Sequence, residues 1–315
     1  STAYTVAPVL YGFKHFYPGI RVVGVVFNFV ASVAHYAYLQ QACVDAGVEA
    51  LGYIPKDESI VIPSRHLGLS IDETFCFDAF ADRVAEVIDK TVNVDRLLEL
   101  CTVEFSGKQT EGVICSGNRK IAIARDEAFN FMYRENVEAL KRAGEVVFFS
   151  PLRDKRLPDA DLVYFPGGYP ELHLPELAAN EGMRQAVRKY CETGGLVLAE
   201  CGGMMYLCDT ITSDDGKVYP MAGVLKQGAT MEQMKLKLGY REVRVNGQRI
   251  RGHEFHYSRI LPGHEKIPVI GTIYNAKDMV VDTPVYTYKN VLASYIHFYW
   301  GECGIDHFLM LMSQK

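Results

Sequence analysis

The sequence predicts an α/β protein made of two domains, each with an open, mostly parallel sheet and flanking helices. Three observations predict this class. Short apolar runs alternate with helical segments along most of the chain, as in sheets built from βαβ units. The 315 residues are enough for about two domains. From residue 222 to residue 299 strand signals follow one another, so the second domain ends in a β-rich part.

Composition and charge exclude several classes of protein. Hydrophobic residues make up 49% of the chain and charged residues 23%, as in ordinary globular proteins. A net charge of -5 without a basic block provides no surface for nucleic acid or an anionic membrane. No apolar run approaches the ~18–20 residues that span a bilayer, and the first residues do not resemble a signal peptide. We therefore expect a cytoplasmic protein with neither nucleic acid nor a membrane as partner.

The first domain is expected to cover residues 1–107. The chain opens on an amphipathic segment, and Gly47 marks the end of a helix that lies between two strands. Residues 106–119 are rich in glycine and polar side chains, which predicts the linker to the second domain. The expected elements are a strand over 22–30, a helix over 39–46, a strand over 49–54 and a helical stretch over 75–100.

The second domain is expected to cover residues 108–315. Strands and helices alternate again before the β-rich part, and Gly144 marks the end of a helix. The expected strands cover 120–124, 145–149, 161–165, 196–199, 239–245, 248–257 and 291–298, and the expected helices cover 128–143 and 182–192.

Cys201 has the sequence context of a catalytic nucleophile. It follows an apolar strand and precedes a helix, in the segment G-G-L-V-L-A-E-C-G-G-M-M-Y-L. A nucleophile on so sharp a turn needs small residues two positions to either side, and Ala199 and Gly203 provide them. We expect the helix N-terminus to favour the thiolate of Cys201, and the N–H of Gly202 to stabilise an oxyanion.

Two further elements fit the same chemistry. The strand over 161–165 runs into P-G-G-Y-P-E, where the N–H of Gly168 can complete an oxyanion hole. His297, at the end of a later strand, is placed to act as general base and acid. Taken singly, each residue also has an ordinary structural explanation: a buried thiol, a glycine-rich turn and a histidine at the end of a strand.

In this order, the three elements resemble the class I, or triad, glutamine amidotransferases. That family usually has a glutamate two residues after the histidine, where this chain has Tyr299. The chain is similar over nearly its whole length to the cobyrinate a,c-diamide synthase family, in which the amidotransferase is known for a Cys–His pair without that glutamate. The matching segments are G-V-V-F-N, L-G-Y-I-P-K-D-E-S-I-V-I-P-S-R-H-L-G-L, I-A-I-A-R-D-E-A-F-N-F-M-Y-R-E-N, F-S-P-L-R-D, F-P-G-G-Y-P-E, A-E-C-G-G-M-M-Y-L, G-H-E-F-H-Y-S and A-S-Y-I-H-F.

The resemblance implies an N-terminal synthetase domain, similar to dethiobiotin synthetase, that uses ATP and Mg2+ to activate carboxylates as acyl phosphates. The chain contains no G-x-x-x-x-G-K-[ST] phosphate loop. We therefore expect a truncated chain whose residues 1–107 are the C-terminal part of that domain and bind ATP weakly.

The same resemblance suggests binding residues. Asn28 and Pro55 would face adenine, and Arg65 and His66 would contact substrate carboxylates. Residues that would hold the glutamine backbone, or brace its pocket, are Glu254, His256, Tyr257 and Ser258. Arg125, Asp126, Tyr133 and Asn136 form a polar set at a strand end and on the following helix, suited to the domain contact or the ammonia path, without a role assigned to each. No further ligands accompany His253 and His256 at metal-site spacing, so no metal site is expected.

The implied function is glutamine hydrolysis within an ATP-dependent ligase that amidates the a and c acetate carboxylates of cobyrinate in cobalamin biosynthesis. Its partners would be L-glutamine and a corrinoid or related tetrapyrrole. Three alternatives stay open: the same chemistry on hydrogenobyrinate or nickel-sirohydrochlorin, a non-catalytic binding or redox-sensing module, and a structural interaction domain. The sequence also leaves open whether the chain forms a homodimer.

Overall fold

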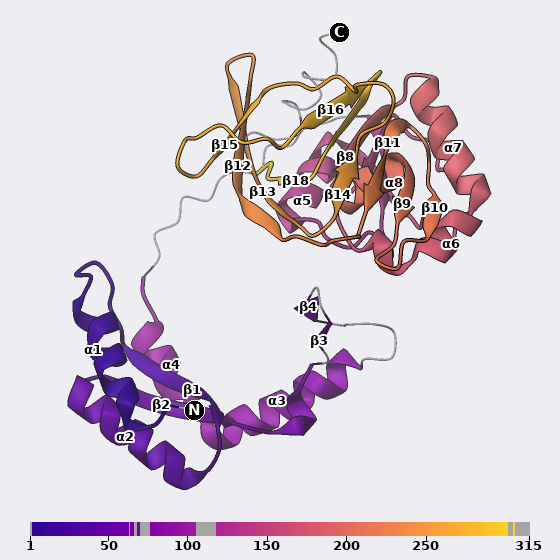
Figure 1. The fold of residues 1–315 in the computed structure, drawn as a ribbon. Coiled ribbons are helices and arrows are strands. Elements are labelled where there is room, and N and C mark those ends of the chain that lie inside the picture. The colour runs from indigo at the N-terminus through magenta and orange to yellow at the C-terminus, as the bar shows by residue number, and fades with distance from the viewer. Residues whose placement is uncertain are drawn as a thin grey trace. The chain divides into compact units, whose positions relative to one another are not determined.

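The computed structural model describes residues 2–62, 64–65, 68–69, 76–104, 118–301 and 305. The chain divides into two compact units, residues 1–110 and residues 111–315 (Figure 1). The boundary expected from the sequence lies a few residues earlier, between 107 and 108. The expected linker over 106–119 lies mostly outside the described residues, and Arg119 is already part of a strand.

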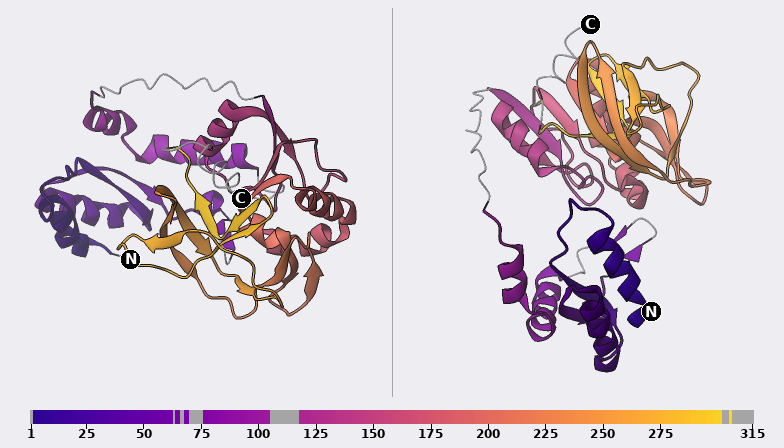
Figure 2. Two further views of the ribbon diagram at one scale, coloured as in Figure 1. Left: turned by 90° about the horizontal axis from the view of Figure 1, so that it is seen from above. Right: turned by 90° about the vertical axis from the view of Figure 1, so that its left-hand side faces the viewer.

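The first unit combines helices with a small parallel sheet (Figure 2). Strands β1 and β2 pair in parallel, with Gly24 opposite Glu49 and Val30 opposite Pro55. A hydrophobic cluster on α1 and α2 includes Leu10 and Cys43. The elements are η1 Tyr4–Val6, α1 Ala7–His15, β1 Gly24–Val30, α2 Val33–Ala46, β2 Glu49–Pro55, η2 Glu58–Ile60, β3 Ser64–Arg65, β4 Gly68–Leu69, α3 Phe77–Thr91 and α4 Val94–Cys101.

Two helix predictions in this unit were wrong in their bounds. Helix α2 starts six residues before the expected position, because the side chain of Ser32 caps it by accepting the N–H of His35 at 3.1 Å. The single helical stretch expected over 75–100 is two helices. Asn93 interrupts it, since its N–H donates to the carbonyl of Leu51 at 2.7 Å and its side chain caps α4.

The second unit is built around a six-stranded sheet in the order β16-β17-β8-β7-β5-β6. All neighbouring pairs except β16 with β17 are parallel. Every residue of β7 is buried, as expected for a strand covered on both faces. Its elements as far as α8 are β5 Arg119–Ala124, α5 Arg134–Ala143, β6 Gly144–Phe149, β7 Leu162–Phe165, η3 Pro170–Leu172, α6 Leu174–Ala179, α7 Glu181–Glu192, β8 Leu196–Glu200 and α8 Gly202–Leu207.

The β-rich part forms two four-stranded sheets, in the orders β10-β9-β11-β14 and β15-β12-β13-β18. In Figure 1, α6 and α7 lie on one side of the unit, and the β12–β13 hairpin lies on the other. The strands are β9 Cys208–Thr212, β10 Val218–Pro220, β11 Leu225–Thr230, β12 Lys237–Val245, β13 Gln248–His256, β14 Arg259–Leu261, β15 Thr272–Asn275, β16 Val285–Tyr288, β17 Val291–Ser294 and β18 Ile296–Phe298.

The helix expected over 128–143 begins only at Arg134, so its first part was predicted wrongly. Asp126 holds the residues after β5 in a loop, because its carboxylate accepts the N–H groups of Ala128 and Leu152 at 3.0 and 2.9 Å. Phe131 N–H also donates to Gly167 O at 3.0 Å, which binds this loop to the turn after β7.

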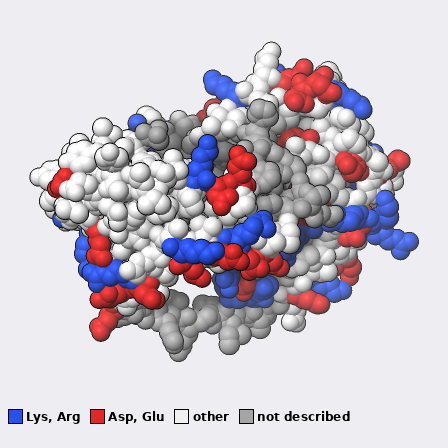
Figure 3. Space-filling view, turned by 90° about the horizontal axis from the view of Figure 1, so that it is seen from below, with Lys and Arg blue, Asp and Glu red and all other residues white. Residues whose placement is uncertain are grey.

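On the face drawn in Figure 3, acidic and basic side chains lie among one another, without a large area of one sign in the described part. None of the helices in the described part is both long enough and apolar enough to cross a membrane.

Candidate active site

Cys201 occupies a strained turn between β8 and α8. Its backbone has φ 46° and ψ -106°, a left-handed conformation that is unfavourable for a residue with a side chain. The N–H of Cys201 donates to Ser294 O at 2.7 Å, so β17 supports the turn from the neighbouring strand. Gly203 must be small, because a Cβ there would lie 2.3 Å from Phe165 O. Strain of this kind often marks a functional residue.

The thiol of Cys201 is enclosed. The residue is 7% exposed, and its Sγ lies 3.9 Å from the carbonyl oxygen of Phe255. Burial raises the pKa of the thiol, the carboxylate of Glu171 raises it further, and only the N–H of Gly202 acts in the opposite direction. Burial thus opposes the thiolate that the helix N-terminus was expected to favour. Helix α8 has only six residues, and desolvation is the largest effect on the thiol.

The P-G-G turn after β7 packs directly on the cysteine turn. Gly168 has φ 155°, and a Cβ there would lie 2.2 Å from Ala128 O, so only glycine fits. A Cβ on Gly202 would lie 3.2 Å from the nitrogen of Gly168. Within the described part of the chain, neither of these two N–H groups donates to a backbone carbonyl. They are adjacent and available to a ligand oxygen.

The His297 ring packs against Gly167 of the same turn. A Cβ on Gly167 would lie 2.2 Å from its Cε1 atom. The ring stacks on His253, with 4.9 Å between centroids, and meets the Phe131 ring edge-on at 4.6 Å. Burial, together with the nearby His253 and His256, lowers the pKa of His297 to about 3. In the ligand-free structure the imidazole is therefore neutral and the thiol protonated.

His297 lacks the side-chain partner of a triad. Its Nδ1 atom is buried and has no hydrogen-bond partner among the described residues. Tyr299, at the position of the usual glutamate, packs perpendicular to the Tyr133 ring at 5.6 Å, and its N–H donates to Arg251 O at 2.9 Å. Ring packing and backbone contacts hold His297 in position, a task that a carboxylate performs in a triad.

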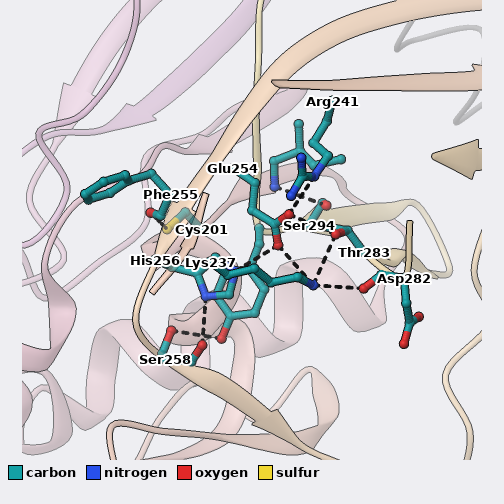
Figure 4. Close-up of polar contacts among 12 residues, drawn as sticks. Cys201, Lys237, Arg241, Glu254, Phe255, His256, Ser258, Asp282, Thr283 and Ser294 are labelled. Carbon is teal, nitrogen blue, oxygen red and sulfur yellow. Dashed lines mark hydrogen bonds and ion pairs between the residues drawn. The ribbon is translucent and has the colours of Figure 1, made fainter. Parts of the chain in front are cut away.

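Behind the thiol, a buried network surrounds Glu254 (Figure 4). Its carboxylate accepts hydrogen bonds from Arg241 at 2.7 Å and Thr283 at 2.9 Å, and pairs with Lys237 at 3.3 Å. Burial would raise the pKa of Glu254, but the hydrogen bond from His256 and these neighbours lower it to about 2. Glu254 therefore remains charged and fully paired. Arg241, Lys237 and Thr283 were not found from the sequence, because nothing local marks which side chain will meet a buried carboxylate.

His256 and Ser258 belong to this network. The imidazole of His256 lies 2.9 Å from Glu254 Oε1 and 2.7 Å from Ser258 O, and it stacks on the Tyr295 ring at 3.5 Å. Ser258 Oγ lies 2.9 Å from Tyr295 Oη. Beside the network opens a cavity of about 510 Å3, whose lining includes Lys235, Tyr257 and Ser258. That volume is within the usual range of small-molecule sites.

A family model described as the CobB/CobQ-like glutamine amidotransferase domain matches residues 120–303. The chain belongs to this family. The resemblance inferred from the motifs is thereby confirmed. The matched residues lie within the second unit, which is a glutamine amidotransferase domain.

Curated relatives match most of the chain. Cobyrinate a,c-diamide synthase from Salmonella typhimurium is 34% identical, over 95% of this chain and 68% of the relative. Hydrogenobyrinate a,c-diamide synthase from Pseudomonas aeruginosa is 36% identical, over 94% of this chain and 67% of the relative. A solved structure of PurLQS from Thermotoga maritima has 20% identity and a TM-score of 0.41, and the match covers 57% of this chain and 87% of that one.

The polar set beside the amidotransferase site acts within the domain. Tyr133 Oη lies 2.5 Å from Nδ1 of His253, the residue stacked on His297. Asn136 bonds to the backbone around β18, Asp126 organises its loop, and the guanidinium of Arg125 lies 5.0 Å from the centre of the Phe148 ring.

The remaining predicted residues lie in the first unit. Asn28 is exposed on β1, inside the strand rather than after it, and its side-chain oxygen accepts the N–H of Phe29 at 2.9 Å. Pro55 ends the neighbouring strand β2. Both thus lie toward the carboxyl ends of parallel strands, where α/β sheets commonly bind ligands. The backbone of Arg65 is in β3, but its side chain and all of His66 lie outside the described residues.

Proposed function

We propose that the chain hydrolyses glutamine to supply ammonia for amide formation on the a and c acetate carboxylates of cobyrinate. One observation carries the proposal: the strained Cys201 turn and the His297 ring both pack on one two-glycine turn with a free N–H group. Nucleophile, base and oxyanion donors are thus provided by adjacent segments.

In the proposed reaction, Cys201 Sγ attacks the side-chain carbonyl carbon of glutamine while its proton passes to His297. The N–H groups of Gly168 and Gly202 stabilise the oxyanion. The C–N bond then breaks, and His297 returns the proton to the leaving ammonia. Water attacks the remaining thioester, its proton passes through His297, and glutamate is released with the thiol restored. Because the thiol begins protonated, the proton transfer is part of the attack.

Glutamine recognition is assigned to the cavity beside the Glu254 network, which His256 and Tyr295 also line. Tyr257 and Ser258 line it, and His256 braces Ser258 through the contact with its carbonyl oxygen. In this assignment the paired carboxylate of Glu254 holds the pocket in shape instead of binding substrate.

ATP and Mg2+ belong to the other half-reaction, where they would activate the carboxylates. The first unit offers the exposed side chain of Asn28, toward the carboxyl end of β1, for a nucleoside, but the sequence provides no phosphate loop. The described residues therefore do not fit tight ATP binding, and no step of the proposed mechanism uses it. Calorimetry with Mg-ATP is expected to give no micromolar binding.

We also propose that the protein acts in the cytoplasm.

The choice of cobyrinate rests on the names of several relatives, and the relative from Pseudomonas aeruginosa makes hydrogenobyrinate the second candidate. Glutamate release by the 315-residue chain tests the glutaminase, which Cys201→Ala is expected to abolish. Turnover by that variant would refute the proposal. Glutamine turnover by the same chain after adding each macrocycle tests the substrate. If only hydrogenobyrinate increased glutamine turnover, hydrogenobyrinate would replace cobyrinate as the proposed substrate.

A further inference from the structure

Glu200, the residue before Cys201, carries a buried carboxylate that the proposed reaction does not use. The residue is 1% exposed. Its Oε2 accepts the hydroxyl of Tyr164 at 2.8 Å, and its Oε1 accepts the N–H of Phe298 at 3.2 Å. Burial raises the pKa of Glu200 to about 8, against the effect of these two hydrogen bonds. Burying a carboxyl group costs free energy, so its two hydrogen bonds are needed to offset its desolvation.

Asn136 binds the same residue, Phe298, from a different element. It is completely buried, its Nδ2 donates to Phe298 O at 2.7 Å, and its Oδ1 accepts the N–H of Trp300 at 2.9 Å. Phe298 therefore has both its N–H and its carbonyl bound by buried side chains, one from β8 and one from α5.

These contacts occupy the free edge of β18. The strand pairs antiparallel with β13, with His297 opposite His253 and Phe298 opposite Gly252. Tyr299 N–H donates to Arg251 O, and antiparallel pairing alternates, so the polar groups of Phe298 point away from β13. Glu200 and Asn136 bind there as a neighbouring strand would, and β18 is thereby held on both edges.

Glu200 and Asn136 together form a clamp on the backbone of Phe298. This clamp lies one residue from His297, whose Nδ1 has no hydrogen-bond partner among the described residues. In a triad, a carboxylate on that nitrogen orients the ring. Here Glu200 and Asn136 bind the backbone of the next residue. Because Glu200 also precedes Cys201, a single side chain connects the nucleophile turn to the strand of the base.

We propose that Glu200 and Asn136 are positioning residues, which orient His297 by clamping the backbone of Phe298 in place of a carboxylate on the imidazole. The inference rests on the proposed glutaminase function. Glu200 acts through its length and its acceptor oxygen, and the negative charge is not required.

Two substitutions of Glu200 distinguish the effect of side-chain length from the effect of the negative charge. Glu200→Gln keeps an acceptor oxygen at the same reach, so its kcat for glutamine is expected within about threefold of the unsubstituted chain. Glu200→Asp keeps the carboxylate but is one methylene too short for Phe298 N–H. Its kcat is expected to fall on the order of 10- to 100-fold, as for displaced supporting groups, with KM nearly unchanged.

Asn136→Ala is expected to lower kcat in the same way, and Asn180→Ala is its matched control. Asn180 is also a buried asparagine whose amide donates to two backbone carbonyls, those of Pro151 and Asp154, both at 2.8 Å. It should lose comparable stability in thermal unfolding and keep its kcat. The rate of Cys201 alkylation by iodoacetamide should be unchanged in Glu200→Asp and in both asparagine variants, because the small electrophile does not require an oriented base and these changes keep the charge beside the thiol.

The proposal is overturned if Glu200→Asp is as active as the unsubstituted chain, if Glu200→Gln loses activity while Glu200→Asp keeps it, or if both asparagine variants lose kcat equally. These results leave the proposed function intact as long as Cys201→Ala and His297→Ala remain inactive. If Asn136→Ala does not fold, the order of the two Glu200 variants still decides the question.

Discussion

The two units differ in how completely their sheets are covered. In the first unit, β1 buries only Val30, and its Val26 and Phe29 are 37% and 66% exposed. In the second unit, β7 buries every residue, and β5 buries its last four. A parallel sheet is stable when both faces are covered, and a two-stranded sheet contributes little by itself. The second unit therefore has the core needed to hold a strained turn such as Cys201, and the first unit does not.

The largest effect is expected from His297→Ala. Because the thiol begins protonated, its attack on glutamine requires the imidazole, and turnover should fall by at least about 10³-fold. The thiol itself remains, so iodoacetamide should still alkylate Cys201 in this variant. Glutamate release and mass spectrometry of the alkylated protein measure the two properties. If the variant does not fold, as judged by circular dichroism, His297 has a structural role instead.

The next effect concerns the units separately. A fragment of residues 111–315 should unfold cooperatively in urea and retain a Cys201 that reacts with a glutamine-mimicking electrophile, since its sheets and site are internal to it. A fragment of residues 1–110 should give a broad, weak transition. A steep, cooperative transition in that fragment would show that the small sheet is more stable than its exposure indicates.

A smaller effect is expected in the pH dependence of stability. His297 titrates at about 3 in the folded protein and near 6.5 unfolded, so between these values the native state binds fewer protons. Its contribution to stability is complete above about pH 6.5 and is lost as the pH falls. Between pH 7.5 and pH 5 the chain should lose about 2 kcal/mol more than His297→Gln. Urea unfolding of both proteins at the two pH values measures this, and parallel losses would refute the buried, neutral histidine.

The smallest effect is expected at Glu171, whose carboxylate raises the pKa of Cys201. Glu171→Gln removes that charge, so the thiol pKa should fall and alkylation at pH 8 should become several-fold faster. Glu176→Gln, at an exposed position on α6, makes the same charge change as a control. Equal rates in both variants would mean that the charge of Glu171 does not reach the sulfur.

Local sequence rules predicted five strands of the six-stranded sheet and both strands of the β12–β13 hairpin, but they missed the sheet β10-β9-β11-β14. They also failed where a distant contact sets a boundary. The strand before Cys201 and the helix ending at Gly144 follow from apolar runs and glycine. The late start of α5 does not, because the loop before it depends on Asp126 reaching residues near 150. The break at Asn93 likewise depends on a carbonyl of β2 that is far away in sequence.

By itself, the sequence determined the family and the order of glycine turn, cysteine turn and histidine strand, because tight turns and strand ends are encoded by neighbouring residues. The tertiary structure alone decided the protonation of the thiol, since burial and Glu171 are consequences of packing. It also decided how the histidine is held. Glu200 and Asn136 reach Phe298 across 98 and 162 residues, and no local pattern records that contact.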